Sequence, residues 1–327
     1  MKNTGTSYES VAEIRTVDVK KKTAKEVWRD NWEYLLMCLP MVLKILLFSV
    51  VPMLWILMAF QDYKGFQGLF GSAWVGFENF EYFFRSGRIW RSIGNTLGLN
   101  IMFIAVGTPV TIAMALFMFE MKSRFTTKFF QTIYFFPYLI SWVIVQYCTD
   151  AILAKNGLIN GILQAFGAER VDFFAATSAG IWPLILLLCN IWKNTGYSLI
   201  MYYSALQSLD TSLIEAAELD GAGKLRVMWH VSLPHLRRIV AILLIMSMGG
   251  IFRSDFGLFW FIPQNDISGA LLSTTETLDT FVYQMSILNF NYSTGTAISL
   301  VQSLVGMGTL LLTNYIVKLI DRESAYI

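Results

Sequence analysis

Charged residues are scarce in this chain of 327 residues: Asp, Glu, Lys and Arg make up only 15% of it, whereas they make up about a quarter of an average soluble domain. Hydrophobic residues make up 55%. This composition is typical of a polytopic, all-α membrane protein. The net charge of +2 gives no reason to expect a nucleic-acid partner.

Histidine and cysteine are also rare. The only histidines are His230 and His235, so a His/Cys metal centre is not expected. The three cysteines, at positions 38, 148 and 189, lie in apolar segments, where we expect buried thiols and no disulfide framework. The sequence therefore predicts no metal site and no catalytic residues.

Long apolar stretches are what the chain has instead. A bilayer core about 30 Å thick is crossed by about 20 apolar residues in a helix. Stretches that meet this length predict six transmembrane helices, at residues 35–60, 92–119, 129–153, 180–206, 236–261 and 296–319. The first follows a polar tail and lacks a small-residue cleavage pattern, so we interpret it as a span and not as a cleaved signal peptide.

Basic residues predict the orientation of these spans. Lys and Arg concentrate in the N-terminal tail, which holds seven of them, and in the connections between the second and third and between the fourth and fifth spans. The connection at 262–295 has none. By the positive-inside rule, both termini and the 208–235 connection face the cytoplasm.

The spans divide the chain into a cytoplasmic tail, residues 1–33, and a six-helix transmembrane domain, residues 34–327. Trp28 and Trp32 lie four apart among basic residues in the tail, which favours an amphipathic helix at the membrane interface. On the outer side, the long 262–295 loop contains a helix-like run from Thr275 to Leu288, which we expect to reach an external partner.

The fifth span is interrupted by polar and small residues, SMGGIFRSDFG, and interrupted membrane helices often border a transported substrate. Charged groups inside membranes usually face a polar cavity or a partner, and aromatic rings beside hydrogen-bonding groups suit sugar rings. A structural ion pair of Arg253 and ordinary packing of the aromatic rings are the alternatives. The substrate-path candidates are Lys193, Asn194, Tyr197, Arg253, Asp255, Phe256 and Tyr147.

The 208–235 connection, which we call the coupling loop, predicts two short helices. Asp210 or Thr211 can cap the first helix, and Gly221 and Gly223 can supply the turn that ends it. A basic amphipathic helix from Lys224 to Val231 follows, and Pro234 is expected to stop it. The result would be a rigid helix–turn–helix along the cytoplasmic face.

The same stretch resembles the EAA motif of ATP-binding-cassette importer permeases. That motif reads Glu-Ala-Ala, three residues, Gly, nine residues, Ile, one residue, Leu-Pro, and in this chain only Val231 departs from it. The matching residues are Glu215, Ala216, Ala217, Gly221, Leu233 and Pro234. The resemblance extends over residues 30–327 to the maltose-permease-like family and, within it, to LplB-like polysaccharide permeases of Gram-positive bacteria, through residues 51–63, 74–80, 136–142, 192–197 and 278–283.

The resemblance implies the type I importer fold in the cytoplasmic membrane, and a mechanism. In the family, the coupling loop docks on an ATPase subunit, and the residue that matches Glu215 pairs with a basic group there. The implied partners are a second permease subunit forming a heterodimer, two ATPase subunits, an extracellular substrate-binding lipoprotein, an oligosaccharide and membrane lipid. ATP and magnesium would bind to the ATPase subunits and not to this chain.

The chain has no phosphate-binding loop of its own. The stretch from Gly221 to Lys224 fails the pattern twice, because Glu218 stands where the first glycine belongs and Leu225 replaces Ser or Thr. An importer permease for another solute class and an ion-coupled secondary transporter are the alternatives. A secondary transporter often shows inverted repeats, which are not visible in this sequence, and a membrane glycosyltransferase would need an acidic cluster that is equally missing from it.

Overall fold

The computed structural model describes residues 23–263 and 269–320. Contacts between Cα atoms divide the chain into two units, Met1–Trp55 and Ile56–Ile327, whereas the sequence predicted a boundary after residue 33. The basic tail at 1–22 and the C-terminal end from 321 lie outside the described residues.

The first unit is helical through its described part. Helix α1 (Ala24–Ile45) continues through the π-helical segment η1 (Leu46–Val50) into η2 (Val51–Phe60), which crosses the unit boundary. Trp28 and Trp32 are both exposed on α1. The predicted interfacial helix is therefore the start of the helix that contains the first span and not a separate element.

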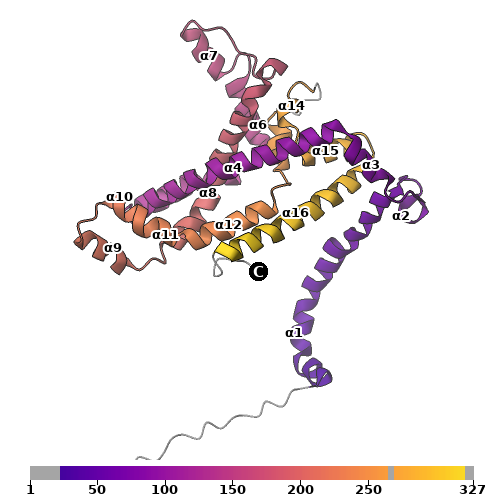
Figure 1. Cartoon of the computed structure of the whole chain (residues 1–327), viewed down its shortest axis with the longest axis horizontal. Coiled ribbons are helices and arrows are strands. Elements are labelled where there is room, and N and C mark those ends of the chain that lie inside the picture. The colour runs from indigo at the N-terminus through magenta and orange to yellow at the C-terminus, as the bar shows by residue number, and fades with distance from the viewer. Residues whose placement is uncertain (1–22, 264–268, 321–327) are drawn as a thin grey trace, which may run out of the picture. The chain divides into compact units, whose positions relative to one another are not determined.

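The second unit contains a short antiparallel hairpin and the remaining helices (Figure 1). In the hairpin, Gln61 of β1 (Gln61–Asp62) lies opposite Trp74 of β2 (Ala73–Trp74). The helices before the coupling loop are α2 (Gly68–Gly71), α3 (Glu78–Arg85), α4 (Gly87–Phe119), α5 (Arg124–Leu139), α6 (Trp142–Leu153), α7 (Leu158–Ala165), η3 (Ala176–Ile181) and α8 (Trp182–Leu206). Those from the coupling loop onward are α9 (Thr211–Leu219), α10 (Lys224–Val227), η4 (Met228–Ser232), α11 (Leu233–His235), α12 (Arg237–Gly249), α13 (Phe256–Phe261), α14 (Leu272–Thr275), α15 (Leu278–Tyr283), η5 (Gln284–Leu288) and α16 (Tyr292–Ile320).

The described residues contain four helices long and apolar enough to cross a membrane, or up to six if each of two bent helix pairs counts as one span. The four are Asn31–Phe60, Gly87–Phe119, Ala176–Leu206 and Tyr292–Leu319, in agreement with the first, second, fourth and sixth predicted spans. The predicted third span is not straight: it bends by 95° between α5 and α6. The predicted fifth span is split into α12 and α13.

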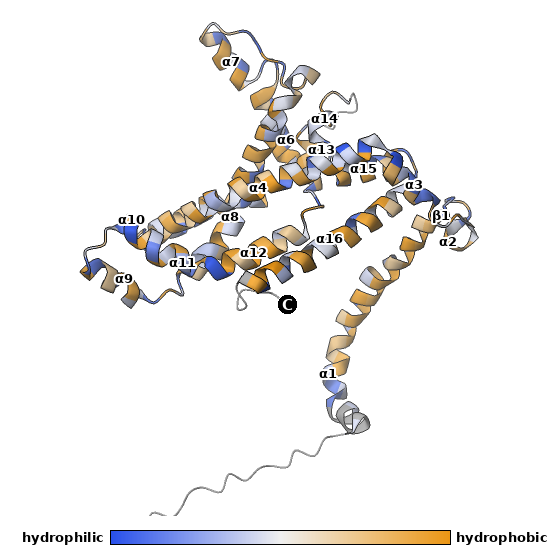
Figure 2. Ribbon diagram, viewed as in Figure 1, coloured by the Kyte–Doolittle hydropathy of each residue, from blue (hydrophilic) through white to orange (hydrophobic). Residues whose placement is uncertain are grey.

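Packing of α4 and α5 against α8, and of α12 against α16, builds the bundle. Figure 2 shows apolar residues along α4, α12 and α16 and hydrophilic residues around α10 and α11. One buried cluster joins α4, α6, α8 and α13 around Trp182 and Leu258. A second joins α4 and α8 to the coupling loop around Leu199 and Leu236.

The three cysteines are free thiols, and they differ in burial. Cys189 is half-buried, whereas Cys38 and Cys148 are exposed in the chain alone. The expectation of buried thiols is therefore wrong for Cys38 and Cys148, because both lie on helix faces that no other described element covers.

Candidate functional site

The first helix of the coupling loop begins where the sequence predicts. Asp210 caps α9: its Oδ1 atom accepts a hydrogen bond from the N–H of Ser212 at 2.9 Å. Gly221 ends the helix with a φ of +79°, a conformation that other residues rarely adopt. The N–H of Ala222 then donates to the carbonyl of Ala217 at 3.0 Å. Both ends of α9 are therefore closed by defined hydrogen bonds.

The second helix of the coupling loop is longer than predicted. It runs from Lys224 to His235 through α10, η4 and α11, so Pro234 does not stop it at Val231. The segment before the proline widens into a π-helix, in which the N–H of Leu233 donates to the carbonyl of Met228. In this wider turn the backbone hydrogen bonds join different carbonyls than in an α-helix, just where Pro234 has no N–H to donate. The chain then bends by 56° into α12.

The motif residues lie on the outside of the coupling loop. Glu215, Ala216, Gly221 and Pro234 are exposed, and Ala217 and Leu233 are half-buried. Between the two helices lies a groove of about 320 Å³, lined by Ala217, Asp220, Ala222, Arg226, Val227, His230 and Val231. Small side chains at 216 and 217 allow another surface to approach the α9 backbone closely.

Contacts at its second helix tie the coupling loop to the bundle. The Nζ atom of Lys224 lies 3.8 Å from a carboxylate oxygen of Glu120, just after α4. The Nε2 atom of His235 lies 3.1 Å from the carbonyl of Ala205 and 3.2 Å from the Oγ atom of Ser208. Leu236 is fully buried against α4 and α8. A displacement of the coupling loop is therefore passed to the bundle helices.

Acid is expected to weaken α9. The hydrogen bonds from Ser212 lower the pKa of Asp210 below its ordinary value. A carboxylate whose pKa is lower in the folded than in the unfolded chain stabilises the fold at pH values above its unfolded-state pKa. This stabilisation is lost as the pH falls through its folded-state pKa. We expect the coupling loop to lose stability below about pH 4, which the pH dependence of thermal unfolding measures. Asp210→Asn, which keeps a capping oxygen, should remove this pH dependence, whereas a pH profile unchanged from wild type would contradict the assignment.

The break in the fifth span, residues 251–255, is an ordered loop whose backbone is bonded to other helices. Asn100 on α4 donates from its Nδ2 atom to the carbonyls of Ile251 and Arg253, both at 2.7 Å. Gln302 on α16 donates to the carbonyl of Phe252 at 2.6 Å. Asp279 on α15 accepts from the N–H of Ser254 at 2.6 Å. Irregular backbone is tolerated inside a membrane when protein groups satisfy it in this way.

Asp255 ends this loop and begins α13. Its Oδ1 atom accepts hydrogen bonds from the N–H groups of Gly257 (3.0 Å) and Leu258 (3.4 Å). Its Oδ2 atom accepts one from the Nε1 atom of Trp142 at 2.8 Å. The indole lies directly over Gly257, where an added Cβ would stand 2.1 Å from the ring. Asp255 is therefore a helix cap joined to α6.

Arg253 points elsewhere. Its Nη2 atom donates to the Oγ atom of Ser303 on α16 at 3.2 Å. Within residues 23–263 and 269–320, no carboxylate lies within ion-pair distance of Arg253. The predicted structural ion pair is thus not formed there, and Arg253 and Asp255 do not pair with each other.

Lys193 is buried at the bend of the third span, with 6% of its surface exposed. Its Nζ atom donates to the carbonyls of Pro137 (3.2 Å), Tyr138 (2.9 Å) and Ile140. It also lies 5.2 Å from the ring centre of Trp142. The carbonyls of Tyr138 and Ile140 stand at the end of α5, where helical donors run out, whereas that of Pro137 also accepts from the N–H of Ile140. The ammonium group of Lys193 is therefore engaged with the end of α5, and its predicted contact with substrate stays a prediction.

A cavity of about 500 Å³ lies between α4, α8 and α12. Asn194 and Tyr197 line it, as two of the predicted substrate-path residues. Asn190, Asn194 and Ser198 follow one another at intervals of four, so they form one polar stripe along α8. No hydrogen bond joins the amides of Asn190 or Asn194 to another described residue. The rest of the lining includes Asn100, Thr108 and Thr111 of α4 and Ser247 and Gly250 of α12.

The remaining two candidates lie outside the cavity lining. Tyr147 is exposed on α6. Phe256 stacks on Trp260, with ring centres 5.5 Å apart, and lies 4.9 Å from the ring centre of Tyr283. Phe256 therefore belongs to an aromatic cluster that connects α13 with α15.

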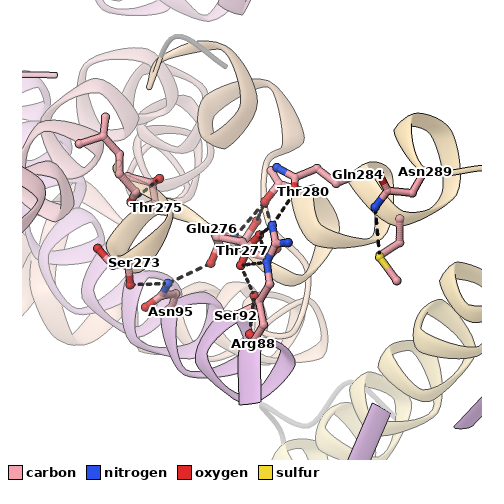
Figure 3. A network of polar contacts seen from close by, with 12 residues as sticks. Arg88, Ser92, Asn95, Ser273, Thr275, Glu276, Thr277, Thr280, Gln284 and Asn289 are labelled. Atoms are coloured by element: carbon pink, nitrogen blue, oxygen red, sulfur yellow. Dashed lines mark hydrogen bonds and ion pairs between the residues drawn. The ribbon is translucent and has the colours of Figure 1, made fainter. Parts of the chain in front are cut away.

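The outer loop 262–295 is packed into the bundle over much of its length. The predicted helix from Thr275 to Leu288 starts instead at Leu278, after an irregular turn, and Leu278 and Phe281 are buried. Figure 3 shows the contact that holds this turn: the buried carboxylate of Glu276 accepts hydrogen bonds from Arg88 and Ser92 at the start of α4. The start of this segment is therefore packed into the bundle, whereas Ile287 and Leu288 are exposed, and the expected contact with an external partner stays a prediction.

Comparison with known proteins assigns this arrangement to a family. Residues 107–325 match the family described as "Binding-protein-dependent transport system inner membrane component". The chain belongs to this family. It is a permease component of an ATP-binding-cassette importer and not the ATPase.

Relatives resemble the permease along nearly its whole length. It is 35% identical over 308 residues to the "Polygalacturonan/rhamnogalacturonan transport system permease protein YteP" of Bacillus subtilis, covering 94% of each chain. It is 33% identical to "Protein LplB" of the same organism, covering 91% of this chain and 92% of that one.

A solved structure confirms the importer fold. The permease matches a chain of a bacterial ABC transporter involved in the import of the acidic polysaccharide alginate, with a TM-score of 0.81 and 28% identity. The match covers 91% of the permease and 99% of that chain. A second structure of the alginate transporter, in complex with an alginate pentasaccharide-bound periplasmic protein, matches equally well.

The permease thus brings together only part of the predicted substrate path. Asn194 and Tyr197 share the cavity, whereas Lys193 and Asp255 fix the ends of broken helices. Sequence reasoning missed the stripe of Asn190 and Ser198, although the spacing of four residues on an otherwise apolar span was a readable signal. It also missed the groups that hold the fifth-span break, which come from α4, α15 and α16.

Proposed function

We propose that the permease carries oligosaccharides through the cavity between α4, α8 and α12. The amides of Asn190 and Asn194, which form no hydrogen bond with another described residue, carry this proposal. Polar groups inside a membrane span are costly unless they meet water, substrate or a partner. Amides and hydroxyls can exchange hydrogen bonds with sugar hydroxyls, and Tyr197 offers an aromatic face. Two similar proteins, a polygalacturonan/rhamnogalacturonan permease and an alginate importer, favour the same class of solute.

The proposed assembly follows from the family. An extracellular binding lipoprotein delivers the sugar, a second permease subunit completes the pore, and two ATPase subunits dock on the coupling loops, where ATP and magnesium bind. Both termini lie in the cytoplasm, and the host is a Gram-positive bacterium. The acidic, exposed Glu215 beside small residues supports the docking, and the distribution of basic residues supports the orientation.

The substrate class can be tested on the reconstituted transporter. ATPase activity would be measured with the cognate binding protein and, separately, with oligogalacturonides, alginate oligomers, maltooligosaccharides and a mixture of amino acids. We expect stimulation by at least one of the sugar oligomers and none by the amino acids. Stimulation by amino acids alone would overturn the sugar assignment.

A substitution in the cavity tests whether Asn194 contacts the substrate or only packs in the bundle. Asn194→Leu has a similar volume but offers no hydrogen bonds, so we expect sugar uptake to fall about tenfold, the cost of one to two hydrogen bonds. Ser204→Leu, on the same helix and outside the cavity lining, is the control and should transport normally. Equal uptake by both variants would remove Asn194 from the substrate path.

A further inference from the structure

The two halves of the fifth span are held in different ways. On the outer side of the break, Leu258, Phe259 and Ile262 are buried in the cluster formed with α4, α6 and α8. On the inner side, α12 packs along α16 and has Ile245 as its one buried residue. It also continues directly into the coupling loop across the 56° bend. One half is therefore fixed in the core, and the other is attached to the element that the ATPase moves.

The loop between the halves belongs to the fixed side. Its carbonyls are bonded to Asn100 of α4 and Gln302 of α16, its Ser254 to Asp279 of α15, and its Asp255 to Trp142 of α6. Four helices thus hold five consecutive residues. A segment with so many defined partners moves with those helices.

Directly before this loop stand Gly249 and Gly250. Gly249 is closely packed, because an added Cβ there would stand 2.5 Å from the side chain of Leu310 on α16. At Gly250 an added Cβ would meet only the carbonyl oxygens of Ser247 (3.7 Å) and Met246 (3.9 Å), so the surroundings of Gly250 are open. The least restrained point of the fifth span therefore lies between α12 and the anchored loop.

We propose that Gly250, which has no Cβ to restrict its backbone, is the hinge at which α12 turns when the coupling loop moves. Trp142, through Asp255, is the positioning residue that keeps the outer side of this hinge fixed. The cavity explains why this matters for transport. Leu243, Leu244, Met246 and Ser247 of α12 form one wall, and α4 and α8 form the others. A turn at Gly250, which also lines the cavity, changes the distance between these walls.

The hinge is tested by stiffening it. The methyl group of Gly250→Ala fits the space available, but alanine has fewer backbone conformations than glycine. The free-energy difference between the two residues corresponds to about a fivefold change in the rate of the hinge movement. In proteoliposomes containing the whole transporter, we expect ATPase activity stimulated by the binding protein to fall about fivefold, with Tm retained. Gly308→Ala, at an open position on α16, is the matched control. Equal stimulation in both variants would overturn the hinge.

The anchor is tested by removing one hydrogen bond. Trp142→Phe keeps an aromatic ring over Gly257 and loses only the Nε1–H that binds Asp255. We expect basal ATPase activity, measured without binding protein, to rise about tenfold, because the resting position of α13 is no longer held. Trp192→Phe, an exposed indole on α8, serves as the control. Basal activity that stays at the wild-type rate, or falls in parallel with stimulated activity and Tm, would overturn the anchor.

A thiol at the hinge reports the same movement directly. In a background where Cys38, Cys148 and Cys189 are replaced by Ser, Gly250→Cys places a reactive group at the edge of the cavity. An impermeant maleimide added from outside should label it only in the presence of ATP. With Trp142→Phe added, we expect labelling without ATP. Labelling that depends on ATP in the same way in both backgrounds would contradict the proposed anchor.

Discussion

Replacing Glu215 by Ala is expected to reduce uptake by about tenfold or more while the permease remains folded and bound to its extracellular binding protein. Glu215 is exposed on α9, and no ion pair with another described residue occupies its carboxylate. In the family, the matching residue pairs with a basic group of the ATPase. A hydrogen bond between charged groups at an interface contributes enough to account for a loss of this size.

Glu218→Ala provides the control. Glu218 lies three residues away on the same helix, is exposed like Glu215, and carries the same charge. Uptake and stimulated ATPase activity are measured in proteoliposomes, and retention of the ATPase subunits is measured by co-purification. Loss of uptake with Glu215→Ala alone supports a specific contact. Equal losses in both variants would show that only the net charge of α9 matters.

Lys193→Met is expected to destabilise the permease strongly. Methionine keeps the apolar stem, so little packing is lost, but the carbonyls of Pro137, Tyr138 and Ile140 lose their shared donor. Buried polar groups left without a partner are costly, although membrane interiors moderate the cost. We expect the free energy of unfolding to fall by about 2–4 kcal/mol.

Thermal unfolding of the purified transporter in detergent measures this effect. Lys128→Met, at an exposed position on α5, is the matched control and should change Tm little. If Lys193 were a substrate contact instead, Lys193→Met would leave Tm unchanged and impair uptake alone. The two roles of Lys193 are thus separated by one measurement.

Local signals in the sequence predicted the parts of the fold that depend on local chemistry. The apolar runs predicted the spans, since the bilayer requires a fixed helix length. Asp210 and Gly221 predicted the ends of α9, because capping and positive φ depend on residues close in the chain. The position of the break in the fifth span also followed from its glycines and charges.

Long-range pairing could not be predicted in the same way. Glu276 lies in a loop without any Lys or Arg, and its partner Arg88 is 188 residues away. A lysine inside a membrane span needs a polar partner, and for Lys193 the sequence suggested a substrate. The backbone carbonyls that become available at the bend between α5 and α6 cannot be recognised from the sequence. Pro234 was expected to end a helix, but a π-helical turn accommodates it.

The cap that Lys193 places on α5 has a consequence for biosynthesis. When α5 and α6 leave the ribosome, the carbonyls of Tyr138 and Ile140 at the 95° bend lack their donor, because Lys193 lies on the next span to be made. The third span is then poorly suited to enter lipid alone, since unpaired carbonyls are costly there. We therefore expect the third and fourth spans to leave the translocon for the lipid as a pair, so that the unit of membrane insertion is a helical hairpin and not a single helix.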